Sequence, residues 1–306
     1  MKIGTKDLLT LSELTAKEFT SVIHHASKLK ADFNSGKQHK TLKSKTLVMI
    51  FQKPSTRTRV SFEAGMYQMG GHAINLAASE MQLSRGETIK DTARTLARYA
   101  DCIMARVYEH SMVEEMALHS TVPVINGLSD MFHPCQILAD FMTINEKKGK
   151  MGGLKIAWIG DGNNVCNSMI YGAALAGSAI TVATPNGYAP SGSVVKEAQR
   201  ETEVNLTTEP LLAAKDADVI ITDTHHSIHT DKQSGRVKAF LPKYQVNQET
   251  MNAADPAAVF MHCLPAKRGQ EVTSDVIDGP RSAVWDEAEN RLHTQKALLA
   301  ALIGQD

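Results

Sequence analysis

Two patterns of apolar and polar positions alternate along the whole chain. Short runs of consecutive apolar residues, such as Thr46–Phe51 (TLVMIF), are typical of strands buried on both faces. Longer stretches with apolar residues three or four positions apart lie between them and predict amphipathic helices. Because each crossover helix returns the chain to the same end of a sheet, this order predicts an α/β fold with mostly parallel sheets.

The first half of the chain predicts four strands and their helices. A capping box from Thr15 to Glu18 predicts a first helix, whose apolar Phe19, Val22, Ile23 and Ala26 share one face. His133-Pro134 opens a long helix with proline in its first turn. The remaining strands are expected at 46–51, 72–76, 102–107 and 122–125, and the remaining helices at 56 to about 70, 87–100 and 109–118.

A charged and then glycine-rich segment, 145–153 (NEKKGKMGG), is the sharpest change of composition and predicts a domain boundary. We therefore expect two doubly wound domains, residues 1–147 and 148–306, each with a mostly parallel sheet flanked by helices. A long amphipathic helix is expected near the end, at about 286–303. The second domain also predicts strands at 154–159, 179–183, 219–222 and 258–262, and helices at 163–175 and 194–200.

Composition narrows the classes of partner. The 306 residues carry 33 Lys+Arg and 33 Asp+Glu, so no global basic field exists to hold nucleic acid or an anionic membrane. The longest apolar runs are too short to span a bilayer. The first 18 residues lack the apolar core of a secretion signal, and four dispersed cysteines without a C-x-x-C motif are typical of reduced thiols. We expect a cytoplasmic protein.

The segment from Ser55 to Arg59 (STRTR) carries the strongest chemical signal. It places three hydroxyls and two arginines where a buried strand gives way to a helix. Free N–H groups at a helix start attract anions, and guanidinium groups match phosphate oxygens. The alternative, a helix cap with two solvated arginines, fits this concentration of groups less well. The segment predicts an anion site.

Two further clusters are weaker when each is taken alone. His133-Pro134-Cys135-Gln136 stands at a helix start, where histidine can polarise a carbonyl and glutamine can hold an amide, but a cap and a surface group are the commoner outcome. The run 262–265 (HCLP) ends a strand, where α/β sheets place their ligands, although a lone buried cysteine is usually inert.

Together, the three clusters resemble the signature motifs of the aspartate/ornithine carbamoyltransferase family, and most closely its ornithine carbamoyltransferases. The resemblance extends over nearly the whole chain and includes the segments 82–87 (QLSRGE), 160–164 (GDGNN) and 287–291 (EAENR). It implies transfer of a carbamoyl group from carbamoyl phosphate to the side-chain amine of L-ornithine. It also implies homotrimers with shared active sites, a C-terminal helix that packs back on the first domain, and no metal or organic cofactor.

The resemblance also assigns roles to individual residues. Arg106, His133 and Cys263 are implied in catalysis. Asn164, Asp223, Ser227 and Ile228 are implied in binding ornithine. Gln82 is expected to serve a neighbouring subunit. The residues implied in binding carbamoyl phosphate are Ser55, Thr56, Arg57, Thr58, Gln82, Arg106, His133, Pro134, Cys135, Gln136, Cys263, Leu264 and Arg291.

Competing interpretations remain for three features. Gly160-Asp-Gly162 follows a strand, but the third glycine of a dinucleotide motif would fall at Val165, so nucleotide binding is disfavoured. His225 and His229 lie four apart, yet their polar loop is not helical as a zinc pair would require. A non-catalytic, ligand-binding relative is the third alternative, and the intact carbamoyl phosphate motifs argue against it.

The acceptor loop departs from the family pattern. Ornithine carbamoyltransferases usually continue Asp-x-x-x-Ser with Met-Gly, whereas Ser227 is followed here by Ile228 and His229. A backbone contact survives an isoleucine, but histidine does not favour the positive φ that glycine adopts freely. Asp223 still favours a free α-ammonium group. L-Ornithine is therefore the expected acceptor, with putrescine or an N-acylated ornithine as the alternatives.

Overall fold

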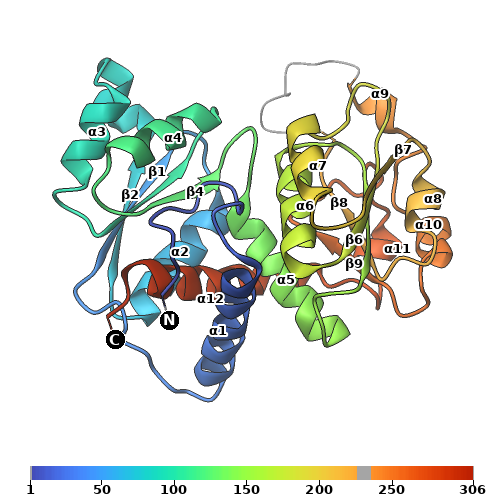
Figure 1. Ribbon diagram of the computed structural model, residues 1–306, viewed down its shortest axis with the longest axis horizontal. Helices are drawn as coiled ribbons and strands as arrows, with labels where there is room; N and C mark the ends of the chain where they lie inside the picture. The colour runs from blue at the N-terminus through green and yellow to red at the C-terminus, as the bar shows by residue number, and fades with distance from the viewer. Residues whose placement is uncertain (1, 226–235, 306) are drawn as a thin grey trace. The chain divides into compact units, whose positions relative to one another are not determined.

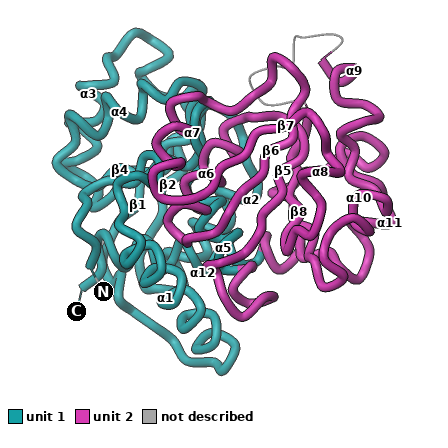
Figure 2. The backbone as a smooth tube through the Cα atoms, turned by 45° about the vertical axis from the view of Figure 1, so that its right-hand side comes forward, with its two compact units in different colours: residues 1–142, 289–306 teal, residues 143–288 magenta. Residues whose placement is uncertain are grey.

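The computed structural model describes residues 2–225 and 236–305. The chain forms two compact units, coloured separately in Figure 2: unit 1 comprises residues 1–142 and 289–306, and unit 2 comprises residues 143–288. Unit 1 gives way to unit 2 after residue 142, within the helix α5 (Pro134–Lys148). The boundary expected after residue 147 lies in the same helix, slightly later in the sequence. A second continuous helix, α12 (Val284–Ile303), begins in unit 2 and ends in unit 1.

Unit 1 is built on a four-stranded parallel sheet with strand order β2-β1-β3-β4. The central strands β1 and β3 are buried on both faces, as their uninterrupted apolar runs predict. On one face, Val48 and Ile50 of β1 pack with side chains of α3 and α4. The strands are β1 (Thr46–Phe51), β2 (His72–Ala77), β3 (Cys102–Arg106) and β4 (Val124–Leu128).

The helices of unit 1 follow the predicted order. Thr15 and Glu18 form the predicted capping box of the first helix. The end of α12 packs back on this unit, because Lys30 donates to Asn290 at 2.8 Å and Lys296 donates to Gln68 at 3.0 Å (Figure 1). Besides α5 and α12, the helices are α1 (Ala16–Asn34), α2 (Thr56–Gln68), α3 (Ile89–Leu96), α4 (His110–His119) and the short 3₁₀ helices η1 (Ala78–Glu80) and η2 (Gln82–Arg85).

Unit 2 is built on a five-stranded parallel sheet with strand order β7-β6-β5-β8-β9. Ala157 and Ile159 of β5 and Phe260 of β9 belong to the core on one face, with side chains of α8, α10 and α11. The strands are β5 (Lys155–Ile159), β6 (Ala179–Ala183), β7 (Val204–Thr207), β8 (Val219–Thr222) and β9 (Val259–His262). The helices are α6 (Asn164–Ala176), α7 (Gly192–Ala198), α8 (Pro210–Ala214), α9 (Arg236–Phe240), α10 (Gln248–Ala253) and α11 (Ser274–Ile277).

The predicted fold class, two mostly parallel sheets flanked by helices, is confirmed. Helix α3 is shorter than predicted, since the chain turns at 97–99 rather than continuing to residue 100. Strand β7 and helices α8 to α11 were not predicted. No helix among the described residues has both the length and the apolar character needed to cross a membrane.

Candidate active site

In each unit the predicted site residues gather where the strand order reverses direction. In unit 1 the chain proceeds outward from β1 to β2 in one direction and from β3 to β4 in the other. The segment after β1 carries Ser55–Thr58, and β3 ends at Arg106. Ligands of open α/β sheets bind outside the carboxyl ends of strands at such switch points. The sheet topology therefore brings the predicted anion site and Arg106 to one edge.

Ser55 caps the helix that begins the anion site. Its extended backbone precedes α2, and its hydroxyl oxygen accepts from the backbone N–H of Thr58 at 3.3 Å. The preceding turn is anchored to β3, because the N–H of Gln52 donates to the carbonyl oxygen of Arg106 at 2.9 Å. The first turn of α2 is thus held beside the end of β3, with the positive end of the helix dipole at the same place.

Thr58 joins two buried arginines. Its hydroxyl oxygen lies 3.5 Å from a terminal nitrogen of Arg106 and 3.4 Å from one of Arg291. The other terminal nitrogen of Arg291 donates to the side-chain oxygen of Gln136 at 2.8 Å, and the Gln136 amide donates to Asp140 at 2.8 Å. All five side chains are at least nine-tenths buried. Residues from four separate segments thus form one polar network in unit 1.

A β-bulge lies beside Arg106. Strand β4 pairs Asn126 with Ala105 but Leu128 with Arg106, so Gly127 is skipped in the ladder. Bulges bend a strand and change the direction of nearby side chains, and they are frequent next to active sites.

The two arginines of the STRTR segment have different surroundings. Arg59 is bound to Glu63 one turn later, with 2.9 Å between guanidinium nitrogen and carboxylate oxygen, and its side chain is 53% exposed. Within residues 2–225 and 236–305, no carboxylate pairs with Arg57, which is half-buried. Arg57 is also close enough for its charge to lower the pKa of His133. Arg57 is therefore the unneutralised cation of the segment.

His133 is buried and neutral. Burial lowers the pKa of its imidazole well below the ordinary value, and the charges of Arg291, Arg106 and Arg57 lower it further. A neutral imidazole carries one N–H donor and one acceptor nitrogen. Cys135, two residues later, donates its thiol to the carbonyl oxygen of Asn126 at 3.5 Å, and burial raises its pKa to about 11. Cys135 is therefore a packing residue and not a nucleophile.

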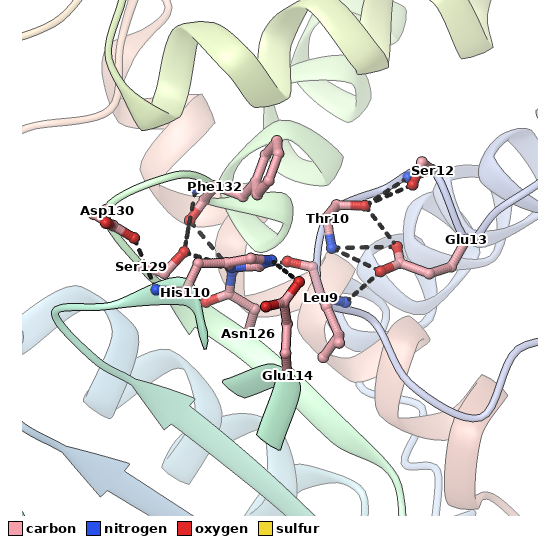
Figure 3. Close-up of polar contacts among 10 residues, drawn as sticks. All are labelled: Leu9, Thr10, Ser12, Glu13, His110, Glu114, Asn126, Ser129, Asp130 and Phe132. Carbon is pink, nitrogen blue, oxygen red and sulfur yellow. Dashed lines mark hydrogen bonds and ion pairs between the residues drawn. The ribbon is translucent and has the colours of Figure 1, made fainter. Parts of the chain in front are cut away.

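A web of hydrogen bonds fixes the turn that leads into His133 (Figure 3). Ser129 donates its backbone N–H to the carbonyl oxygen of Phe132 at 2.9 Å, and its hydroxyl accepts the Phe132 N–H at 3.2 Å. The Asn126 amide donates to the same hydroxyl at 3.3 Å, and a 2.9 Å hydrogen bond joins His110 Nδ1 to it. The turn is therefore set by side chains that a search for catalytic motifs does not select.

The same web reaches the N-terminal segment. The Asn126 amide donates to the carbonyl oxygen of Leu9 at 2.8 Å, and the carboxylate of Glu13 accepts the backbone N–H groups of Leu9 and Thr10 at 3.0–3.2 Å (Figure 3). The position of His133 thus depends on residues more than a hundred positions away in the sequence.

In unit 2 the switch point lies between β5 and β8. Asn163 caps α6 with its side-chain oxygen and donates its amide to Asp223 at 2.7 Å. Asp223 follows β8 and also accepts from the thiol of Cys263, which follows β9, at 3.1 Å. Asn164 begins α6 and is buried. The predicted ornithine residues Asn164 and Asp223 therefore lie at one sheet edge with Cys263.

His262 shapes the turn after β9. Its Nδ1 accepts from the backbone N–H of Leu264 at 2.8 Å, and its Nε2 lies 3.3 Å from Glu271. Leu264 has a φ of 57°, a left-handed conformation that costs a non-glycine residue about 1–2 kcal/mol. Strain of this kind persists where surrounding contacts impose it. The buried His262–Glu271 pair supplies those contacts.

One group of possible metal ligands occurs in the described part of the chain: Asp223, His262 and Cys263, whose ligand atoms lie within 4.8 Å of one another. Both nitrogens of His262 are already engaged with Leu264 and Glu271, so binding a metal would break a buried hydrogen bond. This arrangement favours a structural role for His262. His229, the partner that the zinc alternative needs, lies outside the described residues.

An ion pair that the sequence did not reveal lies near Asp223. Asp161 follows β5, and its carboxylate pairs with Arg236 at the start of α9. Burial raises the pKa of Asp161 to about 6, which the charge of Arg236 opposes. The Arg236 guanidinium also lies 4.6 Å from the ring centre of Tyr188. The sequence gives no signal of this ion pair, because Asp161 and Arg236 are 75 positions apart.

One described residue among those predicted, Gln82, lies outside these clusters. Gln82 begins η2 and is exposed. Ser227 and Ile228 lie outside the described residues.

Comparisons with known proteins cover nearly the whole chain. A sequence model described as "Aspartate/ornithine carbamoyltransferase, carbamoyl-P binding domain" matches residues 6–146, and one described as "Aspartate/ornithine carbamoyltransferase, Asp/Orn binding domain" matches residues 152–302. The chain belongs to the aspartate/ornithine carbamoyltransferase family. Its carbamoyl phosphate and amino-acid binding domains are the two that this family combines.

Individual carbamoyltransferases agree over nearly full length. An ornithine carbamoyltransferase of Cenarchaeum symbiosum is 60% identical over 99% of both chains. The structure of the Pyrococcus furiosus ornithine carbamoyltransferase superposes with a TM-score of 0.93 at 53% identity over 97% of both chains. An anabolic enzyme of that name from Campylobacter jejuni gives 0.91 at 39% identity, over 97% of this chain and 99% of its own.

Proposed function

We propose that the protein transfers the carbamoyl group of carbamoyl phosphate to the side-chain amine of L-ornithine, giving L-citrulline and phosphate. The observation that carries the proposal is the cation cluster of unit 1. Thr58 joins Arg106 to Arg291. The unneutralised Arg57 lies at the start of α2, and the neutral His133 lies at the start of α5. Such a cluster suits a substrate that carries both a phosphate group and a carbonyl oxygen.

The phosphate end of the substrate is assigned to the start of α2. Backbone N–H groups there, with the side chains of Ser55, Thr56 and Thr58, offer hydrogen bonds to phosphate oxygens, and Arg57 supplies a forked cation. These donors stabilise phosphate both as part of the substrate and as the departing group. The helix start therefore acts on binding and on leaving-group departure together.

The carbonyl oxygen is assigned to Arg106 and His133. The neutral amine of the acceptor attacks the carbamoyl carbon, and negative charge gathers on that oxygen. The bond to phosphate then breaks, and the departing phosphate takes up the proton that the amine loses. A fixed donor in such a place is worth about 3–4 kcal/mol. Gln136 already has its amide oriented by Arg291 and Asp140, which suits it to hold the carbamoyl NH₂ group.

Ornithine is assigned to unit 2. Asp223 offers a carboxylate for the α-ammonium group, and Asn164 offers an amide for the carboxylate. Ser227 and Ile228 remain assigned to ornithine, and Pro134, Cys135, Cys263 and Leu264 to carbamoyl phosphate, on the family resemblance. No metal or organic cofactor enters any step. An anabolic role in arginine synthesis is consistent with the anabolic relative from Campylobacter jejuni named above.

The assembly is proposed to be a homotrimer, in which Gln82 serves the site of a neighbouring subunit. The exposure of Gln82 on η2 is consistent with that role. A cytoplasmic location is proposed from the four dispersed cysteines, among which no C-x-x-C motif occurs. Mixing Gln82→Ala subunits with Arg106→Ala subunits should restore part of the activity lost by each, and a fully active monomer in sedimentation would contradict the proposal.

The decisive experiment measures citrulline formation by the purified protein with a metal chelator present and no nucleotide added. Arg106→Met should lower kcat by about 100-fold or more. The exposed Arg98→Met, a matched change in the same unit, should leave kcat unchanged. Comparing kcat/KM for ornithine, putrescine, N-acetylornithine and lysine tests the acceptor. A preference for one of the last three would overturn ornithine while leaving carbamoyl transfer in place.

A further inference from the structure

A cavity of about 630 Å³ in unit 1 lies among residues to which the proposed reaction assigns no role. It is lined by the end of α1, the segment 36–40, the end of α2 and Lys296 of α12. Its volume is in the range of small-molecule pockets, which are about 300–1,000 Å³. The STRTR segment, Arg106 and His133 do not line it.

Lys296 is a buried cation bordering this cavity. The residue is only 2% exposed, and its stem packs closely on α2, where Gly65 leaves room for it. Its ammonium donates to the side-chain oxygen of Gln68 at 3.0 Å and lies 4.9 Å from the ring centre of Phe33. Within residues 2–225 and 236–305, no carboxylate pairs with it. Burial without a counter-charge lowers its pKa to about 8.

The other cations of the lining are neutralised or exposed. Lys37 and His39 share the carboxylate of Asp32, at 3.4 and 2.8 Å, and Lys37 is 59% exposed. A buried charge is normally paired, because removing it from water is costly. Lys296 is therefore the position in this cavity where an anion from outside the chain would gain most.

Part of the lining is apolar and aromatic. Leu29 and Met69 are buried, whereas the aromatic residues Phe33 and Tyr67 are exposed. A single buried ammonium matches a monoanion, whereas phosphate groups are usually held by several donors or by forked guanidinium groups. We propose that this cavity binds a small carboxylate with an aromatic or branched apolar body, its carboxylate paired with Lys296 and its body against Phe33 and Tyr67.

Calorimetric titration with phenylacetate, phenylacetamide and inorganic phosphate tests the proposal. Phenylacetate should bind once per chain, and its uncharged analogue phenylacetamide at least ten-fold more weakly, since the paired charge is lost. Phosphate should not compete with it. Equal binding of phenylacetate and phenylacetamide, or displacement by phosphate, would overturn the proposal.

Two lysines of the same cavity provide a matched pair of variants. Lys296→Met keeps the apolar stem and should weaken phenylacetate binding at least ten-fold, whereas Lys37→Met should change it less than about two-fold. Arg106→Met should leave phenylacetate binding intact, which separates this cavity from the active site. Equal losses in the two lysine variants would mean a general surface charge effect and would refute a specific site.

Discussion

Replacing Arg57 by methionine should remove most of the affinity for carbamoyl phosphate, whereas the same change at Arg59 should remove almost none. Both arginines belong to one sequence motif, and the motif gives no reason to expect different roles for them. The structure separates them, because Glu63 neutralises Arg59 while no carboxylate of the described residues pairs with Arg57. Methionine retains most of the apolar stem, so the comparison isolates the guanidinium group.

The magnitudes follow from the two environments. A forked arginine–phosphate pair provides two charge-assisted hydrogen bonds, each worth about 1.5–3 kcal/mol, so Arg57→Met should cost about 3–6 kcal/mol of transition-state stabilisation. At about 1.4 kcal/mol per factor of ten, kcat/KM should fall by roughly 10² to 10⁴. An exposed pair one helical turn apart is worth about 0.3–0.5 kcal/mol, so Arg59→Met should change kcat/KM less than about three-fold.

The assay is citrulline formation at saturating ornithine with carbamoyl phosphate varied. Inorganic phosphate binding, followed by the shift in thermal midpoint, gives a second readout, because a ligand that binds only the folded state raises its stability. Arg57→Met should abolish most of that shift, and Arg59→Met should keep it. Equal losses in the two variants would refute the assignment of the phosphate to Arg57 and with it the significance of the Glu63 pair.

Three further predictions concern other parts of the molecule. The pKa of His133 is lowered in the folded state, so on acidification the unfolded chain binds a proton at this position first, and the free energy of unfolding should fall below about pH 6.5. Measured by urea titration, its fall with decreasing pH should be steeper in the wild type than in His133→Gln by up to about 1.4 kcal/mol per pH unit. Equal slopes would contradict a neutral His133. Asp223→Asn should raise the KM for ornithine at least ten-fold with little effect on the KM for carbamoyl phosphate. The control Asp218→Asn, which changes a partly exposed ion pair with Lys148, should alter neither KM. A rise confined to the KM for carbamoyl phosphate would contradict the assignment of Asp223 to ornithine. Glu271→Gln should lower the free energy of unfolding by about 1–2 kcal/mol, because it weakens the hydrogen bonds of Glu271 with His262 and with the Lys267 N–H. The control Asp278→Asn, at an exposed ion pair, should lower it by less than about 0.5 kcal/mol. Equal losses in a denaturant titration would argue against a structural role for the buried His262–Glu271 pair.

The sequence predicts best where local pattern and local chemistry coincide. The run Thr46–Phe51 is buried along β1 as its composition predicts, and the capping box predicted at Thr15 is present. Strand β7 was missed because it is an edge strand with exposed Asn205 and Leu206, so it lacks an apolar run. Helices α8 to α11 have four to six residues, too few to show a helical period.

The parts of the site that escaped prediction depend on long-range contacts. Asp140 lies one helical turn after Gln136 and orients its amide, yet in sequence it is an ordinary polar residue of a helix. Glu13 supports the turn before His133 through Leu9 and Asn126, across more than a hundred positions. Such partners have no local signature, because only the fold brings them together. Motifs therefore locate the groups that touch substrate more readily than the groups that hold them.

Both units use the same structural device with opposite charge. Each places its polar groups at the carboxyl ends of strands where the strand order reverses, beside the start of the next helix. In unit 1 the groups there are the cations Arg57, Arg106 and Arg291, which suit a phosphorylated substrate. In unit 2 the corresponding edge carries the carboxylates of Asp161 and Asp223, and Arg236 already neutralises the first of them. Asp223, bound by the uncharged Asn163 and Cys263, is thereby left as the carboxylate suited to a substrate ammonium. The difference in charge, on one shared topology, is what separates a site for the carbamoyl donor from a site for the amino-acid acceptor.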